Sequence, residues 1–149
     1  MTFMQNKGNM PSTVSISLIA KSDVEDAWRD AATLVRLSQK RVDDYTGMAD
    51  IYDDLLRGEM QLWTVKIEDK LKAAVVTMVE QHPRKRILRV MHVGGFDMGL
   101  WLDPLISALQ DGAKQVGCKN IIADCRIGWA KKLPARGWKE AARLYELEI

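Results

Sequence analysis

Residues 86–125, "RILRVMHVGGFDMGLWLDPLISALQDGAKQVGCKNIIADC", decide the fold because they predict a strand, a helix and a second strand in direct succession. The apolar run 86–93 is typical of a strand. A helix is expected over 104–116, and the short apolar run 120–125 predicts a buried strand. Two strands joined by a crossover helix are parallel in nearly all proteins. We therefore predict a parallel strand pair here.

The loop "GGFDMG" (94–99) lies between that first strand and the helix. Asp103 is a favoured N-cap residue and Pro104 a favoured first helical residue, so we expect the helix to begin there. Glycines allow backbone to approach a ligand closely, and a helix N-terminus favours anions. The loop matches neither the P-loop pattern nor the dinucleotide-binding pattern. An anion site and an unoccupied turn both remain open.

The rest of the chain predicts one mixed, mostly antiparallel sheet with helices on both faces, in a single α/β domain. We expect a flexible tail over 1–12 and the domain over 13–149. Short, turn-punctuated links make the three middle strands an antiparallel meander. The expected strands are 14–20, 61–67, 72–81, 86–93, 120–125 and 138–149, and the expected helices are 23–40, 48–57, 104–116 and a brief one near 130.

Composition and charge narrow the class of protein. No apolar stretch approaches the roughly 20 residues needed to cross a membrane, and the N-terminus lacks the order of a secretory signal. Cys118 and Cys125 form no disulfide or zinc pattern, so we expect reduced thiols in a cytoplasmic protein without a metal. Residues 1–83 carry 10 Lys and Arg against 13 Asp and Glu, whereas 84–143 carry 12 against 5. This asymmetry suggests an anionic partner on one side.

The segments "LRGEMQLWTV" (56–65), "LRVMHVGG" (88–95) and "LISALQDGAKQVGCKNIIADCRIGWAKKLPARGWKE" (105–140) carry a family resemblance. Together they resemble the GCN5-related N-acetyltransferases, and most closely the small, divergent versions that bacteriophages and prophages encode. The resemblance covers about two thirds of the chain, from about residue 50 to 149. It implies the acetyltransferase fold, in which two central parallel strands splay apart.

The resemblance also implies a site for acetyl-CoA, or another acyl-CoA, between the splayed strands. The pantetheine arm would pair with the backbone near His92, Val93 and Gly94. The pyrophosphate would rest on the following loop, and Arg126 could reach a phosphate through its guanidinium. The loop residues implied in cofactor binding are Phe96, Met98, Gly99 and Leu100.

The implied reaction is direct attack of an amine on the thioester, with a strand amide stabilising the developing oxyanion. His92 is the first candidate for the general base and Glu80 the second. A packed strand histidine and a solvated glutamate are the structural alternatives. The tyrosine that often protonates the departing thiolate in this family falls on Leu133, which cannot donate a proton. The alternative function is therefore an inactive phage protein of this fold that binds a host or virion protein.

Four tryptophans complete the set of candidate site residues. Trp63 and Trp138 are expected in strands of the core, whereas Trp101 and Trp129 could line a pocket or anchor a partner. The expected partners are an acyl-CoA and an unknown amine acceptor, with a host or virion protein or a homodimer as further candidates. Nucleic acid ranks last because no known binding motif accompanies the tryptophans. A phage-encoded protein would act in the host cytoplasm or travel in the virion.

Overall fold

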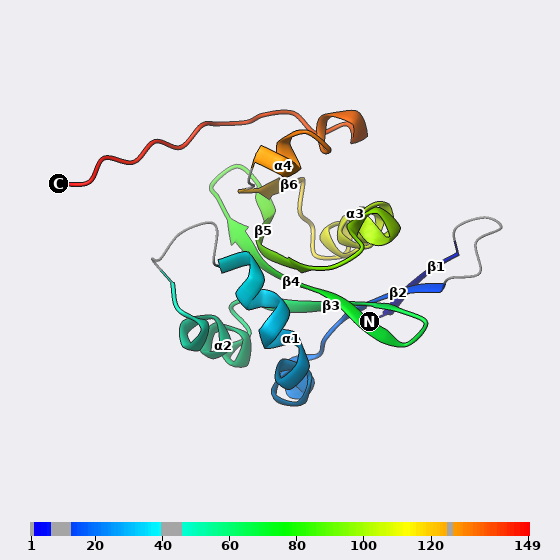
Figure 1. The fold of residues 1–149 in the computed structure, drawn as a ribbon. Helices are drawn as coiled ribbons and strands as arrows, with labels where there is room; N and C mark the ends of the chain where they lie inside the picture. Colours follow the sequence, from blue (N-terminus) through cyan, green and yellow to red (C-terminus); the bar gives the residue numbers. More distant parts are fainter. Residues whose placement is uncertain (1, 7–12, 40–45, 125–126) are drawn as a thin grey trace.

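The computed structural model describes residues 2–6, 13–39, 46–124 and 127–149. A layer of strands lies between helices on its two faces (Figure 1). The elements in chain order are β1 (Thr2–Asn6), β2 (Thr13–Leu18), η1 (Lys21–Asp23), α1 (Val24–Gln39), α2 (Met48–Arg57), β3 (Gln61–Ile67), β4 (Lys70–Gln81), β5 (Arg86–Gly95), α3 (Met98–Gln115), β6 (Asn120–Ala123), α4 (Ile127–Ala130) and η2 (Pro134–Arg136). Helices α1 and α2 precede the central meander, and α3 and α4 follow it.

The six strands form one sheet in the order β1-β2-β3-β4-β5-β6. Neighbouring strands are antiparallel throughout, except that β5 and β6 are parallel. Helices α1 and α2 cover one face of the sheet and α3 covers the other (Figure 1). The predicted mixed sheet with helices on both faces is therefore confirmed, as is the parallel pair around the crossover helix.

Each face of the sheet has its own apolar core. On the α3 side, Trp63 is 2% exposed, and its indole Nε1 donates a hydrogen bond to Thr77 Oγ1 over 2.9 Å. This bond satisfies the one polar atom of the ring inside the core. On the opposite side, Ala31, Val35 and Ile51 pack against the sheet with no exposed area. Alternation along the strands divides the side chains between the two cores.

The hairpin between β3 and β4 is closed by two residues that both have positive φ. Glu68 has φ 51° and Asp69 has φ 64°. Two-residue hairpin loops favour this backbone because its twist matches that of the flanking strands. Neither residue is glycine, so both have a backbone conformation that L-residues seldom adopt.

Helix α3 begins at Met98, so the predicted start at Asp103 and Pro104 is wrong. Leu100 N donates to Asp97 O over 2.9 Å, which closes the first turn well before the proline. Trp101, Leu105 and Ala108 follow at helical spacing and are buried on the sheet. That burial outweighs the lost amide hydrogen bond of Pro104, which lies inside the helix.

Both chain ends differ from the prediction. Residues Thr2–Asn6 form β1, paired with β2, rather than a loose tail, because the first strand offers an unpaired edge. Residues 138–149 form no strand: Leu144, Tyr145, Leu147 and Ile149 are 84–114% exposed. Alternation predicts a strand only where a sheet covers one face, and this segment runs away from the sheet (Figure 1). The boundary at residue 12 between tail and domain stays a prediction, because residues 7–12 lie outside the described residues.

Candidate active site

Strand β5 is paired with β6 over only part of its length. The pairs run from Ile87 with Asn120 to Val90 with Ala123, whereas β5 continues to Gly95 beside β4. The register with β4 skips Met91, so β5 carries one extra residue directly after its last pair with β6. Such a bulge bends a strand and increases its local twist. The parallel pair therefore opens at Val90, as the family resemblance implies.

Beyond the bulge, the backbone of Val93 faces the opening. Phe96 N donates to Lys72 O over 2.9 Å, which marks that position as a hydrogen-bonded pair with β4. In an antiparallel ladder such pairs alternate with positions whose N–H and C=O point to the other side. By this alternation, the backbone N–H and C=O groups of His92 and Gly94 point toward β4, whereas those of Val93 point toward the cleft.

A cleft lies in this opening, with an open volume of about 620 Å³ that includes solvent at its mouth. It extends to both faces of the sheet, because Ser38 of α1 and Leu105 of α3 both line it. Ligand pockets of small-molecule enzymes have a similarly apolar lining. The lining residues are Ser38, Val90, Met91, His92, Val93, Leu102, Leu105, Ile106, Leu109, Ala123, Asp124, Trp129, Leu133 and Trp138.

His92 lines the cleft from the α1 side of β5. The side chain is half-buried, and its Nδ1 lies 3.3 Å from Ser38 Oγ. Of the residues that line the cleft, His92 and Asp124 are the two with titratable side chains. His92 is therefore well placed to exchange a proton with a molecule in the cleft.

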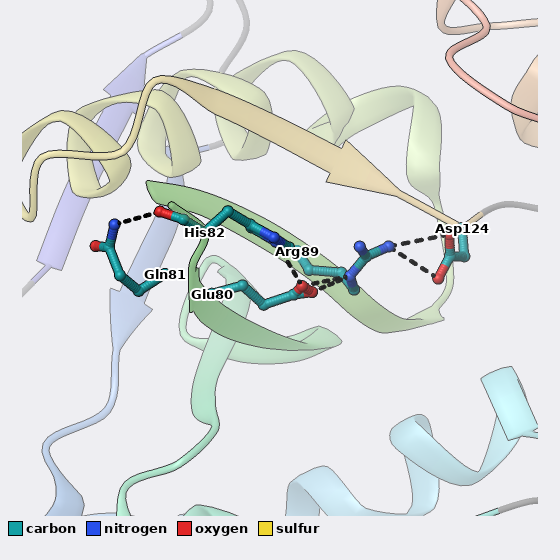
Figure 2. Close-up of polar contacts among 5 residues, drawn as sticks. All are labelled: Glu80, Gln81, His82, Arg89 and Asp124. Atoms are coloured by element: carbon teal, nitrogen blue, oxygen red, sulfur yellow. Dashed lines mark hydrogen bonds and ion pairs between the residues drawn. The ribbon is translucent and has the colours of Figure 1, made fainter. Parts of the chain in front are cut away.

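Glu80 lies on β4 in an ion-pair network rather than in the cleft lining (Figure 2). Its carboxylate accepts from Arg89 Nε at 2.5 Å, and Arg89 Nη1 also donates to Asp124 Oδ1 at 3.3 Å. The hydrogen bond from Arg89 holds the pKa of Glu80 below its usual value of 4.5, against the opposing effect of burial. A carboxylate stabilised in this way is a poor proton acceptor. The network instead ties β4, β5 and the end of β6 together.

The glycines of the loop mainly allow close packing. A Cβ on Gly94 would lie 1.8 Å from Leu34 O of α1, and one on Gly95 would lie 2.4 Å from Lys72 O. A Cβ on Gly99 would meet nothing within 4 Å. Gly94 therefore lets α1 lie directly on β5. This role was not predicted, since backbone approach to a ligand was the expected reason for the glycine.

The N-terminus of α3 lies at the end of the same strand. Asp97 precedes it with φ 60° and makes no side-chain cap, and its carboxylate lies 3.4 Å from Lys72 Nζ. Lys72 thus brings a positive charge from β4 to a loop that has none of its own. A helix N-terminus beside an ammonium group favours an anion.

The other residues predicted to bind the cofactor differ in their exposure and in their position relative to the cleft. Phe96 is 59% exposed, whereas Met98 and Leu100 pack partly against the α3-side core. Of the predicted cofactor-binding residues that the structure describes, His92 and Val93 line the cleft. Arg126 and Cys125 lie outside the described residues. Cys118 is buried, and burial raises the pKa of its thiol.

The far wall of the cleft comes from the segment after β6. Trp129 lines it as predicted, and Leu133 lies beside it, 8% exposed, where the family often has tyrosine. Trp138 is half-buried in the cleft rather than in a strand of the core, and Trp101 is a core residue, 1% exposed. The correction for Trp138 follows from the C-terminal segment, which leaves the sheet, and that for Trp101 follows from the early start of α3.

Ser38 and the α3 leucines are among the cleft residues that the sequence did not single out. Ser38 continues the buried stripe of α1 through Ala31 and Val35, at spacings of four and three residues. A lone hydroxyl at a core position of an amphipathic helix is the signal that could have identified it.

Comparisons with known proteins agree with the geometry. No protein-family model matches the sequence, and no curated protein matches it either. Three of the solved structures that share the fold illustrate the likeness. An aminoglycoside N-acetyltransferase, AAC(6')-Iy, in complex with CoA has TM-score 0.68 and 14% identity over 95% of this chain and 97% of that one. A ribosomal-protein-alanine N-acetyltransferase from Brucella melitensis biovar Abortus 2308 has TM-score 0.64 and 17% identity, over 91% and 97%.

The third is glucosamine-6-phosphate N-acetyltransferase from Arabidopsis thaliana, with TM-score 0.61 and 15% identity, again over 91% and 97%. The chain therefore has the acetyltransferase fold that the resemblance implies. At these identities the likeness shows the fold alone. Among the residues that the structure describes, no helix has the length and apolarity to cross a membrane.

Proposed function

We propose that the protein is an acyl-CoA-dependent N-acyltransferase that transfers an acetyl group to an amine of a small molecule or a protein. The observation that carries this proposal is the cleft between β5 and β6, which is lined by residues of helices on both faces of the sheet. A donor would bind on the α3 side and an acceptor on the α1 side. The two reactants would then meet at His92 and Val93.

The described residues fit the pantetheine arm of an acyl-CoA. That arm alternates amide groups with short apolar links, and the cleft offers the outward backbone of Val93 beside aliphatic side chains of α3. The N-terminus of α3 suits the negatively charged end, and the acidic Asp97 beside it is paired with Lys72. When bound, acetyl-CoA would supply an activated thioester carbonyl.

The chain's own groups would then do three things. The N–H of Val93 would donate to the thioester carbonyl oxygen as negative charge develops on it. His92 would accept the proton of the attacking amine. Leu133, Trp129 and Trp138 would exclude water from the reacting atoms.

Binding of acetyl-CoA is tested by thermal unfolding. A ligand at 100 times its dissociation constant adds about 2.7 kcal/mol, and each kcal/mol raises the midpoint by roughly 2–4 °C in a chain of this size. Ala123→Phe should fill the opening and abolish the shift. Ala49→Phe, on the exposed surface of α2, is the matched control and should retain it. A shift that survives Ala123→Phe would place the ligand elsewhere, and no shift at millimolar acetyl-CoA would exclude the proposal.

Turnover is tested by release of the CoA thiol with a panel of amines. The panel should contain an aminoglycoside, an amino-sugar phosphate and a peptide with a free N-terminus, which are the acceptor classes suggested by the structural neighbours. His92→Gln should lower turnover by about 10²–10⁴-fold and leave the thermal shift intact. Unchanged turnover would remove His92 from the mechanism.

One observation favours the second candidate, a non-catalytic protein of the same fold that binds a host or virion protein. Leu133 lies in the cleft, where a proton donor would otherwise stand. A thermal shift without turnover on any amine would support this candidate. We further propose, from the resemblance to phage versions, that either protein would act in the cytoplasm of an infected host or travel in the virion.

A further inference from the structure

Residues 139–149 form an extended C-terminal segment, the arm, that lies apart from the sheet (Figure 1). The arm contains no helix and no strand of the described structure. Its large apolar side chains are 84–114% exposed, and they are Leu144, Tyr145, Leu147 and Ile149. Apolar surface gathered in this way on a soluble chain marks a site that binds a partner.

The arm has the residue pattern of a strand. Apolar side chains alternate with glutamates in the order Tyr145, Glu146, Leu147, Glu148 and Ile149. An extended backbone therefore places the apolar side chains on one face and the carboxylates on the other. A strand alone is not stable in water, because its backbone and its apolar face both need a neighbour. The arm is therefore suited to the edge of a sheet.

Strand β6 offers such an edge. It is the last strand of the sheet, and its strand neighbour among the described residues is β5. Ile121, Ile122 and Ala123 are only half-buried. By contrast, Ile87 and Leu88 of the adjacent β5 are 2% and 3% exposed. The outer edge of β6 thus has both backbone groups and apolar surface to offer another strand.

The charges at the two ends of this edge favour an antiparallel arm. β6 is preceded by the exposed Lys119 and followed by Asp124, whose side chain is 64% exposed. The arm has Arg143 near its start and Glu148 near its other end. Antiparallel pairing brings Arg143 close to Asp124. It also brings Glu148 close to Lys119, whereas parallel pairing would bring like charges together.

We propose that two copies of the chain exchange their arms, and that each arm adds as an antiparallel strand to the β6 edge of the other copy. Arm and edge belong to the same chain, so one twofold arrangement pairs both arms and both edges. The arm leads away from its own sheet, which favours the edge of a second copy over its own β6 (Figure 1). Tyr145 and Leu147 would then cover Ile121 and Ala123, which pack partly against the α3-side core.

The oligomeric state tests this exchange without any substrate. Sedimentation equilibrium of the full chain should give twice the chain mass of 16.9 kDa. Leu147→Asp places a charge in the apolar face of the arm and should weaken association by roughly tenfold or more. Leu56→Asp changes an exposed leucine of α2 and is the matched control that should stay dimeric. A wild type that is monomeric at its highest soluble concentration, or a dimer unaffected by Leu147→Asp, overturns the proposal.

Cross-linking identifies the edge that receives the arm. A carbodiimide joins a lysine to a carboxylate where the two groups touch, so it should link Lys119 to Glu148. In an equilibrated mixture of ¹⁴N- and ¹⁵N-labelled chains, mass spectrometry should find this link between one light and one heavy peptide. Lys119→Arg keeps the charge but lacks the amine, so it should retain the dimer and lose the link.

Two results of the cross-linking experiment would overturn the exchange. Links confined to peptides of one label would place the arm on its own β6, and links from Glu148 that avoid Lys119 would place it on another surface. Neither the sedimentation nor the cross-linking depends on acyl-CoA. The exchange is therefore decided separately from the proposed function.

Discussion

Both halves of β5 lie beside β4 on one side, whereas on the other side one half pairs with β6 and the other half borders the cleft. Residues 86–90 lie between β4 and β6, and Ile87 and Leu88 are buried. Residues 91–95 keep β4 but face the cleft on the other edge. The change occurs at Met91, the residue that the register skips. A single extra residue thus converts a core strand into a strand with an accessible backbone edge.

The largest expected effect concerns the packing that supports the cleft half. Gly94→Ala places a Cβ against the backbone of Leu34, which cannot move without shifting α1. We expect a loss of about 3 kcal/mol or more in the free energy of unfolding, measured by urea denaturation.

Gly99→Ala is the matched control, since its Cβ has open space in the first turn of α3. Alanine there should stabilise the helix by up to about 1 kcal/mol. Equal midpoints for wild type and Gly94→Ala would show that α1 does not lie directly on β5.

The paired half is expected to depend on the network of Arg89 in Figure 2. Arg89→Met leaves the partly buried Glu80 without its main partner and should cost about 1–2 kcal/mol, between the values for exposed and buried ion pairs. Urea denaturation measures the loss. Lys66→Met removes an exposed charge from β3 and should change stability by less than about 0.5 kcal/mol.

The same network predicts a pH dependence of known sign. The folded-state pKa of Glu80 is lowered, so its stabilising contribution is complete above the usual value of 4.5 and is lost as pH falls through the folded-state pKa. The stability difference between wild type and Arg89→Met should therefore shrink on acidification. A difference that grows in acid would contradict the ion pair.

The smallest expected effect concerns the wall of the cleft opposite β5. Arg136 Nε lies 2.6 Å from Asp103 Oδ1 and joins η2 to α3. Because both side chains are largely exposed, Arg136→Ala should cost less than about 1 kcal/mol. It should nevertheless speed amide hydrogen exchange over 127–137. Arg143→Ala, which removes an exposed ion pair with Glu140, should leave that exchange unchanged.

Strong local patterns made much of the fold predictable. The alternation of apolar residues was sufficient to predict β3, β4 and β5. Gly58 was predicted to end α2, and its φ of 79° is typical of a residue that ends a helix. The start of α3 was mispredicted because Asp103 and Pro104 are residues typical of a helix start. The burial of Trp101 extends the helix upstream of them. Local preference yields to burial in such cases.

The candidate site was less predictable because it depends on register and on distant contacts. The extra residue at Met91 leaves the apolar pattern of β5 intact, so that pattern alone does not reveal where the strands open. Glu80 resembled a base until Arg89 was placed beside it. Ser38 lies 54 positions from His92, and only the packing of α1 on β5 brings the two together.

The β3–β4 turn offers a way to study all of these variants. Glu68 and Asp69 both have positive φ, a backbone conformation that asparagine and glycine adopt more readily. Exchanging the pair for Asn-Gly relieves that conformational cost at a site remote from the cleft lining. The more robust parent that results would tolerate damaging changes around β5, so that lost chemistry could be told apart from lost folding.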